Sequence, residues 1–147
     1  MGIISRFPAG ATKPYIEEIY NSDGQLIDVK MYGYKTIRSG AFSGCVSLAL
    51  ITLSSGITSI GAYAFASCFS LALTTLPSGI TNIGNYAFSS CSSLASLTFE
   101  GTPEHISYAT FIGCDNLTTI NVPWAEGAVA DAPWGATNAT INYGHTG

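Results

Sequence analysis

Apolar positions recur along the middle of this chain with a fixed spacing of 23 residues. The pattern is clearest from Ile60 to Leu71, and it returns from Ile83 to Leu94. Three of its positions are filled four times in register: Phe42, Phe65, Phe88 and Phe111; Cys45, Cys68, Cys91 and Cys114; Leu48, Leu71, Leu94 and Leu117. A fixed period between about 20 and 50 residues predicts a solenoid, in which each unit buries its apolar edge against its neighbours.

Each unit predicts two short strands. Its leucine is followed by apolar residues three and five positions later, as at Leu94, Leu97 and Phe99, which is the leucine-rich repeat spacing. The last two of these residues are expected to point inward along a strand, and the strands to stack in parallel, one per coil. A second apolar pair, such as Ile57 and Ile60, predicts a second short strand. The Ala-Phe pair that follows predicts a short turn of helix or 3₁₀-helix.

Alternation along the first strand of each unit predicts an outward face. In the second unit Thr74 takes the inward position, so Leu73 and Thr75 are expected to face outward. The outward positions form two columns, Leu50, Leu73, Ser96 and Thr119 beside Thr52, Thr75, Thr98 and Asn121. An apolar and hydroxyl-rich face of this kind is a candidate contact surface. The alternative is that Leu50 and Leu73 only pack against the N-terminal segment.

Two tyrosines form a second candidate surface. Tyr63 and Tyr86 are one period apart, so their rings are expected to stack on successive coils. Such a pair can hold a sugar ring or a partner's side chain, although the pattern favours simple packing of the two rings.

The flanks carry no clear copy of the repeat. Residues 1–36 contain two β-type runs, Tyr15–Tyr20 and Leu26–Tyr32, around a turn with Asp-Gly, which predicts a hairpin that caps the first coil. Alternatively, the lead 1–14 docks onto another protein. The repeats occupy residues 37–123. Residues 124–147 predict a C-terminal cap, in which Trp124 and Trp134 lie flat over the end of the core.

Charge is sparse and unevenly placed. Charged residues make up 10% of the chain, the net charge is -4, and all five basic residues lie within the first 38 positions. Nucleic acids and anionic membranes require a basic surface, so neither is an expected partner. No stretch approaches the ~18 consecutive apolar residues of a membrane span. The N-terminus lacks the apolar segment of a secretory signal, so no signal peptide is expected.

The reactive side chains predict no catalytic, cofactor or metal site. The four cysteines stand one per coil, roughly 4.8 Å apart and pointing the same way. Parallel neighbours are poorly placed for a disulfide, and the sequence has no Cys-x-x-Cys pair for zinc. We therefore expect a buried, reduced cysteine ladder. His105 and His145 are isolated, and no nucleophile triad, phosphate loop or carboxylate pair accompanies them.

The repeat itself, Ile-Gly-x-x-Ala-Phe-x-x-Cys-x-x-Leu followed by a Leu-x-x-Ile-x-Leu strand, resembles the BspA-type leucine-rich repeats over about residues 37–123. The resemblance implies a right-handed, β-rich solenoid of about four coils. It also implies a non-enzymatic role in adhesion or protein binding, typically on bacterial or parasite surfaces. The two flanks are similar to those of short repeat proteins encoded by phages and prophages.

These observations favour a virion-associated tail or fibre protein of a phage or prophage. Its expected partner is a protein or a cell-surface glycan, and its expected location is the virion or an extracellular surface. Four coils give only about 20 Å of sheet, which favours a homo-oligomer or a place in a larger assembly; phage fibres suggest a trimer. The alternative is a cell-surface or secreted bacterial adhesin that binds a host protein as a monomer.

Overall fold

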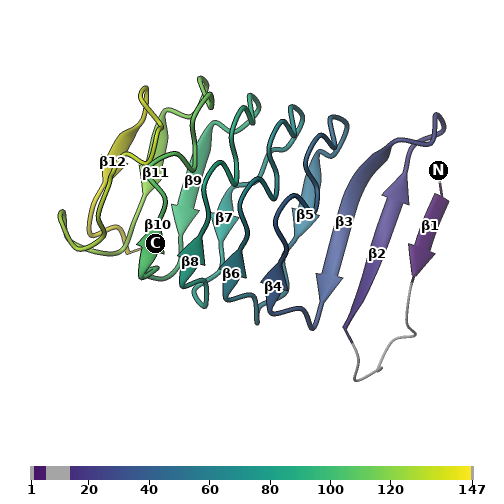
Figure 1. Cartoon of the computed structure of the whole chain (residues 1–147), viewed down its shortest axis with the longest axis horizontal. Coiled ribbons are helices and arrows are strands. Elements are labelled where there is room, and N and C mark those ends of the chain that lie inside the picture. Colours follow the sequence, from purple (N-terminus) through teal and green to yellow (C-terminus); the bar gives the residue numbers. More distant parts are fainter. Residues whose placement is uncertain (1, 6–13, 147) are drawn as a thin grey trace.

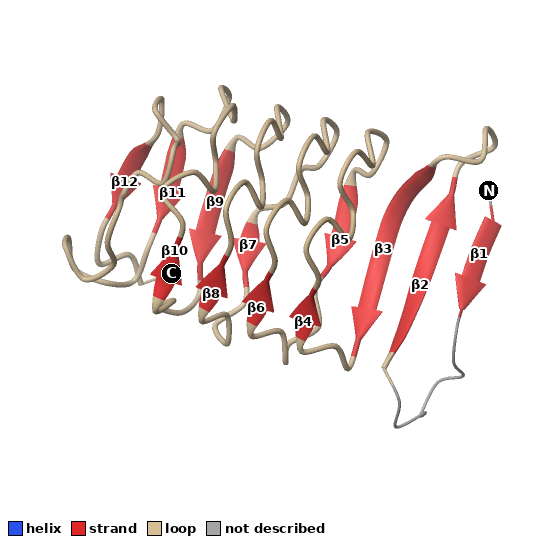
Figure 2. Cartoon of the chain, in the orientation of Figure 1, coloured by secondary structure: helices blue, strands red, loops and turns tan. Residues whose placement is uncertain are grey.

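The chain winds into an all-β solenoid, and its N-terminal sheet of four strands includes a strand of the first coil (Figure 1). A computed structural model describes residues 2–5 and 14–146. Over these ranges it contains strands and turns but no helix (Figure 2). The strands are β1 (Gly2–Ser5), β2 (Tyr15–Tyr20), β3 (Leu26–Tyr32), β4 (Thr36–Ile37), β5 (Leu50–Thr52), β6 (Ser59–Ile60), β7 (Thr75–Leu76), β8 (Asn82–Ile83), β9 (Ser96–Phe99), β10 (His105–Ile106), β11 (Thr119–Asn121) and β12 (Thr140–Asn142).

The strands of the solenoid form two rows. The short row is one parallel sheet in the order β4, β6, β8, β10. The long row contains β3, β5, β7, β9, β11 and β12 (Figure 1). Its parallel pairs join β3 to β5 and then run from β7 through β9 and β11 to β12. The predicted leucine-rich repeat solenoid is confirmed, and β3 and β12 extend it beyond the four coils counted in the sequence.

The long row is interrupted between β5 and β7, where the repeat has a polar residue at a position that is apolar in the neighbouring strands. The inward positions of neighbouring strands hold Ile51 and Leu97, but the second coil has Thr74, which is exposed. Leu73 is partly buried instead and packs against the core. The inward direction predicted for Thr74 is therefore wrong, because burying an unpaired hydroxyl costs roughly 1–3 kcal/mol. The coil turns its leucine inward at this point, and β7 begins only at Thr75.

The segments predicted as short helical turns are successive β-turns. The N–H of Ala64 donates to the carbonyl of Gly61 at 3.2 Å, which is the spacing of a 3₁₀-helix. Tyr63 and Ser67 both have φ of 59°, in the left-handed region, so a right-handed helix cannot form. The turns also bond to each other, since the N–H of Phe42 donates to the carbonyl of Ala64 one coil later at 2.7 Å. The turns thus form a third ladder between the two rows of strands.

The repeated phenylalanines form a stacked column inside the solenoid. Ring centroids lie 5.4 Å apart between Phe42 and Phe65, 5.2 Å between Phe65 and Phe88, and 5.7 Å between Phe88 and Phe111. The last three rings are fully buried, and Phe42 at the open end is nearly so. This column is the centre of the hydrophobic core.

The cysteines form the predicted ladder of free thiols. The Cys68 thiol donates to the carbonyl of Phe42 at 3.1 Å, and Cys91 and Cys114 make the same bond with the phenylalanine carbonyls of their preceding coils. Cys45 is only partly buried, because no preceding turn covers it. Burial raises the pKa of Cys68 to about 12, and burial together with the charge of Glu18 raises the pKa of Cys45.

Thiol reactivity should follow this ladder. In the native protein near pH 8, a disulfide reagent is expected to modify Cys45 first, while the three buried thiols react at least about tenfold more slowly, since only an accessible thiolate attacks. The Cys45 rate should rise with pH, because its raised pKa leaves little thiolate at neutral pH. The unreduced, denatured chain should yield four thiols. A count of two or none would contradict the ladder, and Cys45→Ser should remove the fast phase only.

The N-terminal hairpin is confirmed and extends the long row. Strands β2 and β3 pair antiparallel from Tyr15 opposite Tyr32 to Tyr20 opposite Leu26, and β1 pairs with the outer edge of β2. The other edge of β3 pairs in parallel with β5. The hairpin therefore continues one row of the solenoid and leaves β4 as the end strand of the other. Most of the lead 1–14, for which docking was considered, lies outside the described residues.

The C-terminal segment adds a strand and two buried indoles. Strand β12 pairs in parallel with β11, with Thr119 opposite Thr140. Trp134 is fully buried and Trp124 nearly so. The two rings do not lie flat over the core as expected: they meet at 73° with centroids 6.1 Å apart, and Trp124 meets Phe99 at 72°. The edge-on arrangement lets both indoles enter the end of the core.

Candidate functional site

The predicted outward residues lie along the long row, and the structure divides them at the break in that row. Leu50 is 58% exposed on β5, and Thr52 is exposed beside it. Leu73 is turned toward the core, so it adds little to the surface. Ser96 is exposed and Thr119 partly so. The continuous part of the predicted face therefore begins at β7.

A column of polar side chains crosses this continuous part in register. We call Thr75, Thr98, Asn121 and Asn142 the polar column; they stand opposite one another on β7, β9, β11 and β12. The amide of Asn142 donates to the side-chain oxygen of Asn121 at 2.8 Å, and the amide of Asn121 donates to the Thr98 hydroxyl at 3.2 Å. The chain of bonds holds three side chains in fixed orientations, while the Thr75 hydroxyl at its end is exposed.

A hollow of about 530 Å³ adjoins the polar column. The C-terminal segment reaches it because the N–H of His145 donates to the carbonyl of Val122 at 2.9 Å. An imidazole, a carboxylate and hydroxyls thus meet at one place. The hollow is lined by Thr75, Thr98, Phe99, Glu100, Pro123, His145 and Thr146.

These groups suit recognition of a polar ligand. Hydroxyls and amides both donate and accept hydrogen bonds, Glu100 accepts them, and Pro123 supplies apolar contact. The volume lies within the usual range of small-ligand sites, about 300–1,000 Å³. In the described part of the chain, no three His, Cys, Asp or Glu side chains come together as a metal site would require.

The two tyrosines stack as predicted. The Tyr63 and Tyr86 rings lie 5.0 Å apart and 18° from parallel, and Tyr63 is 49% exposed. Both residues stand in turns that follow the short row, so they do not contribute to the hollow. Their use in binding stays a prediction.

Glu100, His145 and Thr146 were missed as site residues. They lie near Thr75 because the C-terminal segment returns to the long row. The sequence contains one feature that indicates this return. The sequence Thr-Ile-Asn occurs at Thr119–Asn121 and again at Thr140–Asn142, the two strands that pair in register. The offset of 21 residues differs from the repeat period, which hid it.

Comparison with known proteins identifies the repeat. The family described as the BspA type leucine rich repeat region matches residues 17–128 in six copies. The chain belongs to this family. Repeats of this kind generally mediate protein–protein interactions and typically act as non-catalytic scaffolds. Most of this BspA-type chain is built from such repeats. Across the described ranges it has no helix long and apolar enough to cross a bilayer.

Solved structures share the BspA-type fold. A leucine-rich repeat protein from Bacteroides ovatus is 27% identical with a TM-score of 0.67; the match covers 84% of this chain and 31% of that protein. This chain thus spans about a third of that relative. A leucine-rich repeat protein from T. pallidum is 21% identical with a TM-score of 0.52, covering 95% and 82% of the two chains, and it supports the fold alone. No curated protein matches this sequence.

Proposed function

We propose that this BspA-type protein is a non-enzymatic attachment module that binds a protein or glycan on a cell surface through the polar column and its hollow. The observation that carries the proposal is the fixed chain of side-chain bonds from Asn142 through Asn121 to Thr98, beside an open hollow of about 530 Å³. Side chains that are already ordered lose little conformational entropy on binding.

The chemistry of the hollow favours a ligand rich in hydroxyl or amide groups. Such a ligand can donate to Glu100 and both donate to and accept from Thr75 and Thr98. Sugar rings and exposed peptide backbones both fit this description. A net charge of -4 disfavours strongly acidic ligands.

Two biological settings agree with this activity. The resemblance of both flanks to short phage and prophage repeat proteins supports a virion-associated tail or fibre protein, with several copies assembled together. The second setting is a bacterial cell-surface or secreted adhesin. The 27% identity to a leucine-rich repeat protein from Bacteroides ovatus supports its bacterial origin. The oligomeric state at micromolar concentration, measured by light scattering, distinguishes the two settings. A strict monomer would count against the fibre subunit.

Binding should depend on the polar column. On an array of bacterial surface glycans and on intact bacterial cells, Thr98→Val combined with Asn121→Leu is expected to reduce binding about 5- to 30-fold, because each lost hydrogen bond contributes about 1 kcal/mol. Thr52→Val is the matched control: it removes an exposed hydroxyl of the same row outside the hollow. Equal binding by the double variant and the wild type would contradict the proposed site.

A further inference from the structure

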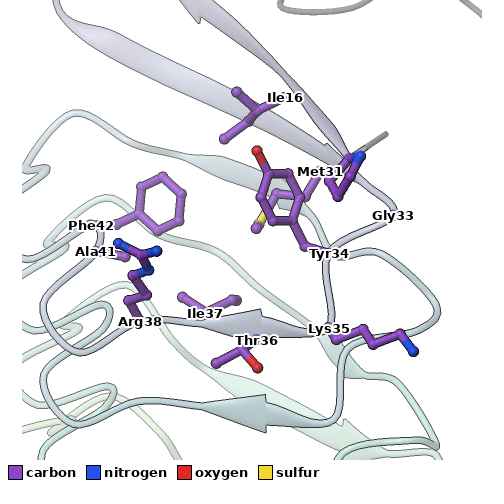
Figure 3. A pocket seen from close by; sticks show the side chains of 11 residues that line it. Ile16, Met31, Gly33, Tyr34, Lys35, Thr36, Ile37, Arg38, Ala41 and Phe42 are labelled. Carbon is purple, nitrogen blue, oxygen red and sulfur yellow. The ribbon is translucent and has the colours of Figure 1, made fainter. Parts of the chain in front are cut away.

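A second cavity lies at the opposite end of the solenoid, between the hairpin and the first coil (Figure 3). Its volume is about 650 Å³, and Ile16 from β2 and Met31 from β3 face Ile37 and Phe42 across it. The cavity exists because the hairpin continues only the long row. Its lining residues are Pro14, Ile16, Met31, Gly33, Tyr34, Lys35, Thr36, Ile37, Arg38, Ala41 and Phe42.

The cavity borders an open β-sheet edge with two amide donors. In later coils, each equivalent N–H donates to a carbonyl of the preceding coil. The N–H of Thr58 donates to the carbonyl of Lys35 at 2.8 Å, and the N–H of Thr81 donates to the carbonyl of Thr58 at 2.7 Å. Three residues after Thr58, the N–H of Gly61 donates to the carbonyl of Ile37 at 2.8 Å. The N–H of Gly84 makes the equivalent bond to the carbonyl of Ile60 at 2.9 Å. The equivalent groups of the first coil are the N–H of Lys35 and of Arg38. Within the described residues β4 is the last strand of its sheet, so both groups face the cavity.

Arg38 differs from its equivalents in a way that limits what can pair there. The next two coils have Gly61 and Gly84 at this position, and the third has the small residue Ser107. A Cβ on Gly61 would lie 2.5 Å from the nitrogen of Ser39 and 2.8 Å from the carbonyl carbon of Arg38. A residue with little or no side chain leaves room for the preceding chain to continue past the strand. The side chain of Arg38 blocks that path, so a strand that pairs with β4 must end or turn away after its last inward residue.

The charge of the rim indicates how such a strand ends. Lys35 and Arg38 are both exposed, and none of the described residues that line the cavity is acidic. The Arg38 side chain extends beside Ala41 and Phe42 at the side of the cavity (Figure 3). A guanidinium bonds a carboxylate with two parallel N–H donors. A chain that stops opposite Ile37 would place its terminal carboxylate next to this group.

We infer that this end of the protein binds the C-terminal tail of a partner protein as an added β-strand. The tail pairs in parallel with β4 through the N–H groups of Lys35 and Arg38, places apolar side chains in the cavity, and ends with a free carboxylate at Arg38. Strand addition of this kind obtains affinity from backbone bonds and specificity from side-chain pockets. This site is separate from the polar column and does not depend on the function proposed for it.

The protein's own repeat supplies a probe. Residues 54–60 end with β6, the strand that occupies the equivalent place before β8. A fluorescein-labelled peptide of this sequence with a free carboxylate should bind the full-length protein, as measured by fluorescence anisotropy. The same peptide with a C-terminal amide should bind about tenfold more weakly or worse, because it loses the charge-assisted bonds to Arg38. A longer peptide of residues 54–65 should also bind weakly, since its chain would collide with Arg38.

Two variants at one position provide the controls. Arg38→Gln should reduce binding of the free-acid peptide to the level of the amide and leave binding of the amide unchanged. Arg38→Gly should lose the same carboxylate preference but gain binding of the 54–65 peptide, because it opens the path that Gly61 and Gly84 open in later coils. The side chain of Arg38 is exposed, so the thermal unfolding midpoints of both variants, followed by circular dichroism, should match the wild type.

Three outcomes would overturn the inference. The first is equal binding of the acid and amide peptides by the wild type. The second is the absence of binding up to millimolar peptide. The third is a wild-type dimer in sedimentation that Arg38→Gln dissociates, which would make a second copy of this chain the occupant.

Discussion

Phe88→Ala is expected to lower the free energy of unfolding by about 3–5 kcal/mol, the usual cost of removing a buried phenyl ring. Phe88 is fully buried and stacks between Phe65 and Phe111 at 5.2 and 5.7 Å. Whole domains are stable by only about 5–15 kcal/mol, so the variant should be near unfolding at room temperature. Urea titration followed by circular dichroism measures the difference.

Phe69→Ala is the matched control for this prediction. Phe69 lies in the preceding repeat and is 47% exposed, outside the column of rings. Its removal should change the free energy of unfolding by no more than about 0.5 kcal/mol. Similar losses in both variants would show that the stacked column does not dominate stability.

Trp134→Ala should have a comparable effect, about 3–5 kcal/mol, although the residue lies outside the regular repeat. Its ring is fully buried, contacts Phe99 and Trp124, and donates from Nε1 to the carbonyl of Ala130 at 2.8 Å. Coils of a solenoid are stabilised by their neighbours, so losing this ring should loosen the last coil and the hollow together. Urea titration and anisotropy with a surface glycan measure both effects.

Trp134→Phe separates the contribution of a buried aromatic ring from that of the indole hydrogen bond. The variant keeps an aromatic group in the core but loses the bond to Ala130, and it should cost about 1–2 kcal/mol. If Trp134→Ala cost no more than this, the C-terminal segment would be an appendage and not part of the core.

The sequence predicted the interior of the solenoid well, because the repeat is a packing rule. Phe65, Cys68 and Leu71 recur at a fixed interval, and identical side chains at that interval can only stack on successive coils. The stacked rings and thiols follow directly from this rule. The hairpin was equally readable, since alternating residues flank an Asp-Gly turn.

Positions where local and periodic signals conflict were harder to predict. Periodicity placed Thr74 inward, but the free energy of burying its hydroxyl favours Leu73 in that place. The left-handed backbone conformation of residues such as Tyr63 was also not predicted, because residues other than glycine rarely adopt it. The helical turns expected at the Ala-Phe pairs fail for this reason.

The two cavities could not be predicted at all from the sequence. One forms where His145 returns to the long row, and the other forms where the hairpin fails to continue the short row at β4. Both depend on contacts between segments far apart in the chain. The clustering of all basic residues before position 39 was visible, but its meaning at Arg38 requires the fold.

The interruption of the long row has a mechanical consequence. Between β5 and β7 the coils are joined on that side by the bond from the N–H of Ala72 to the carbonyl of Ala49, whereas the short row is continuous from β4 to β10. Resistance to bending is therefore unequal on the two sides. The N-terminal sheet with β5 and the coils from β7 onward should act as two blocks joined by a one-sided hinge, with amide hydrogens exchanging fastest along the seam.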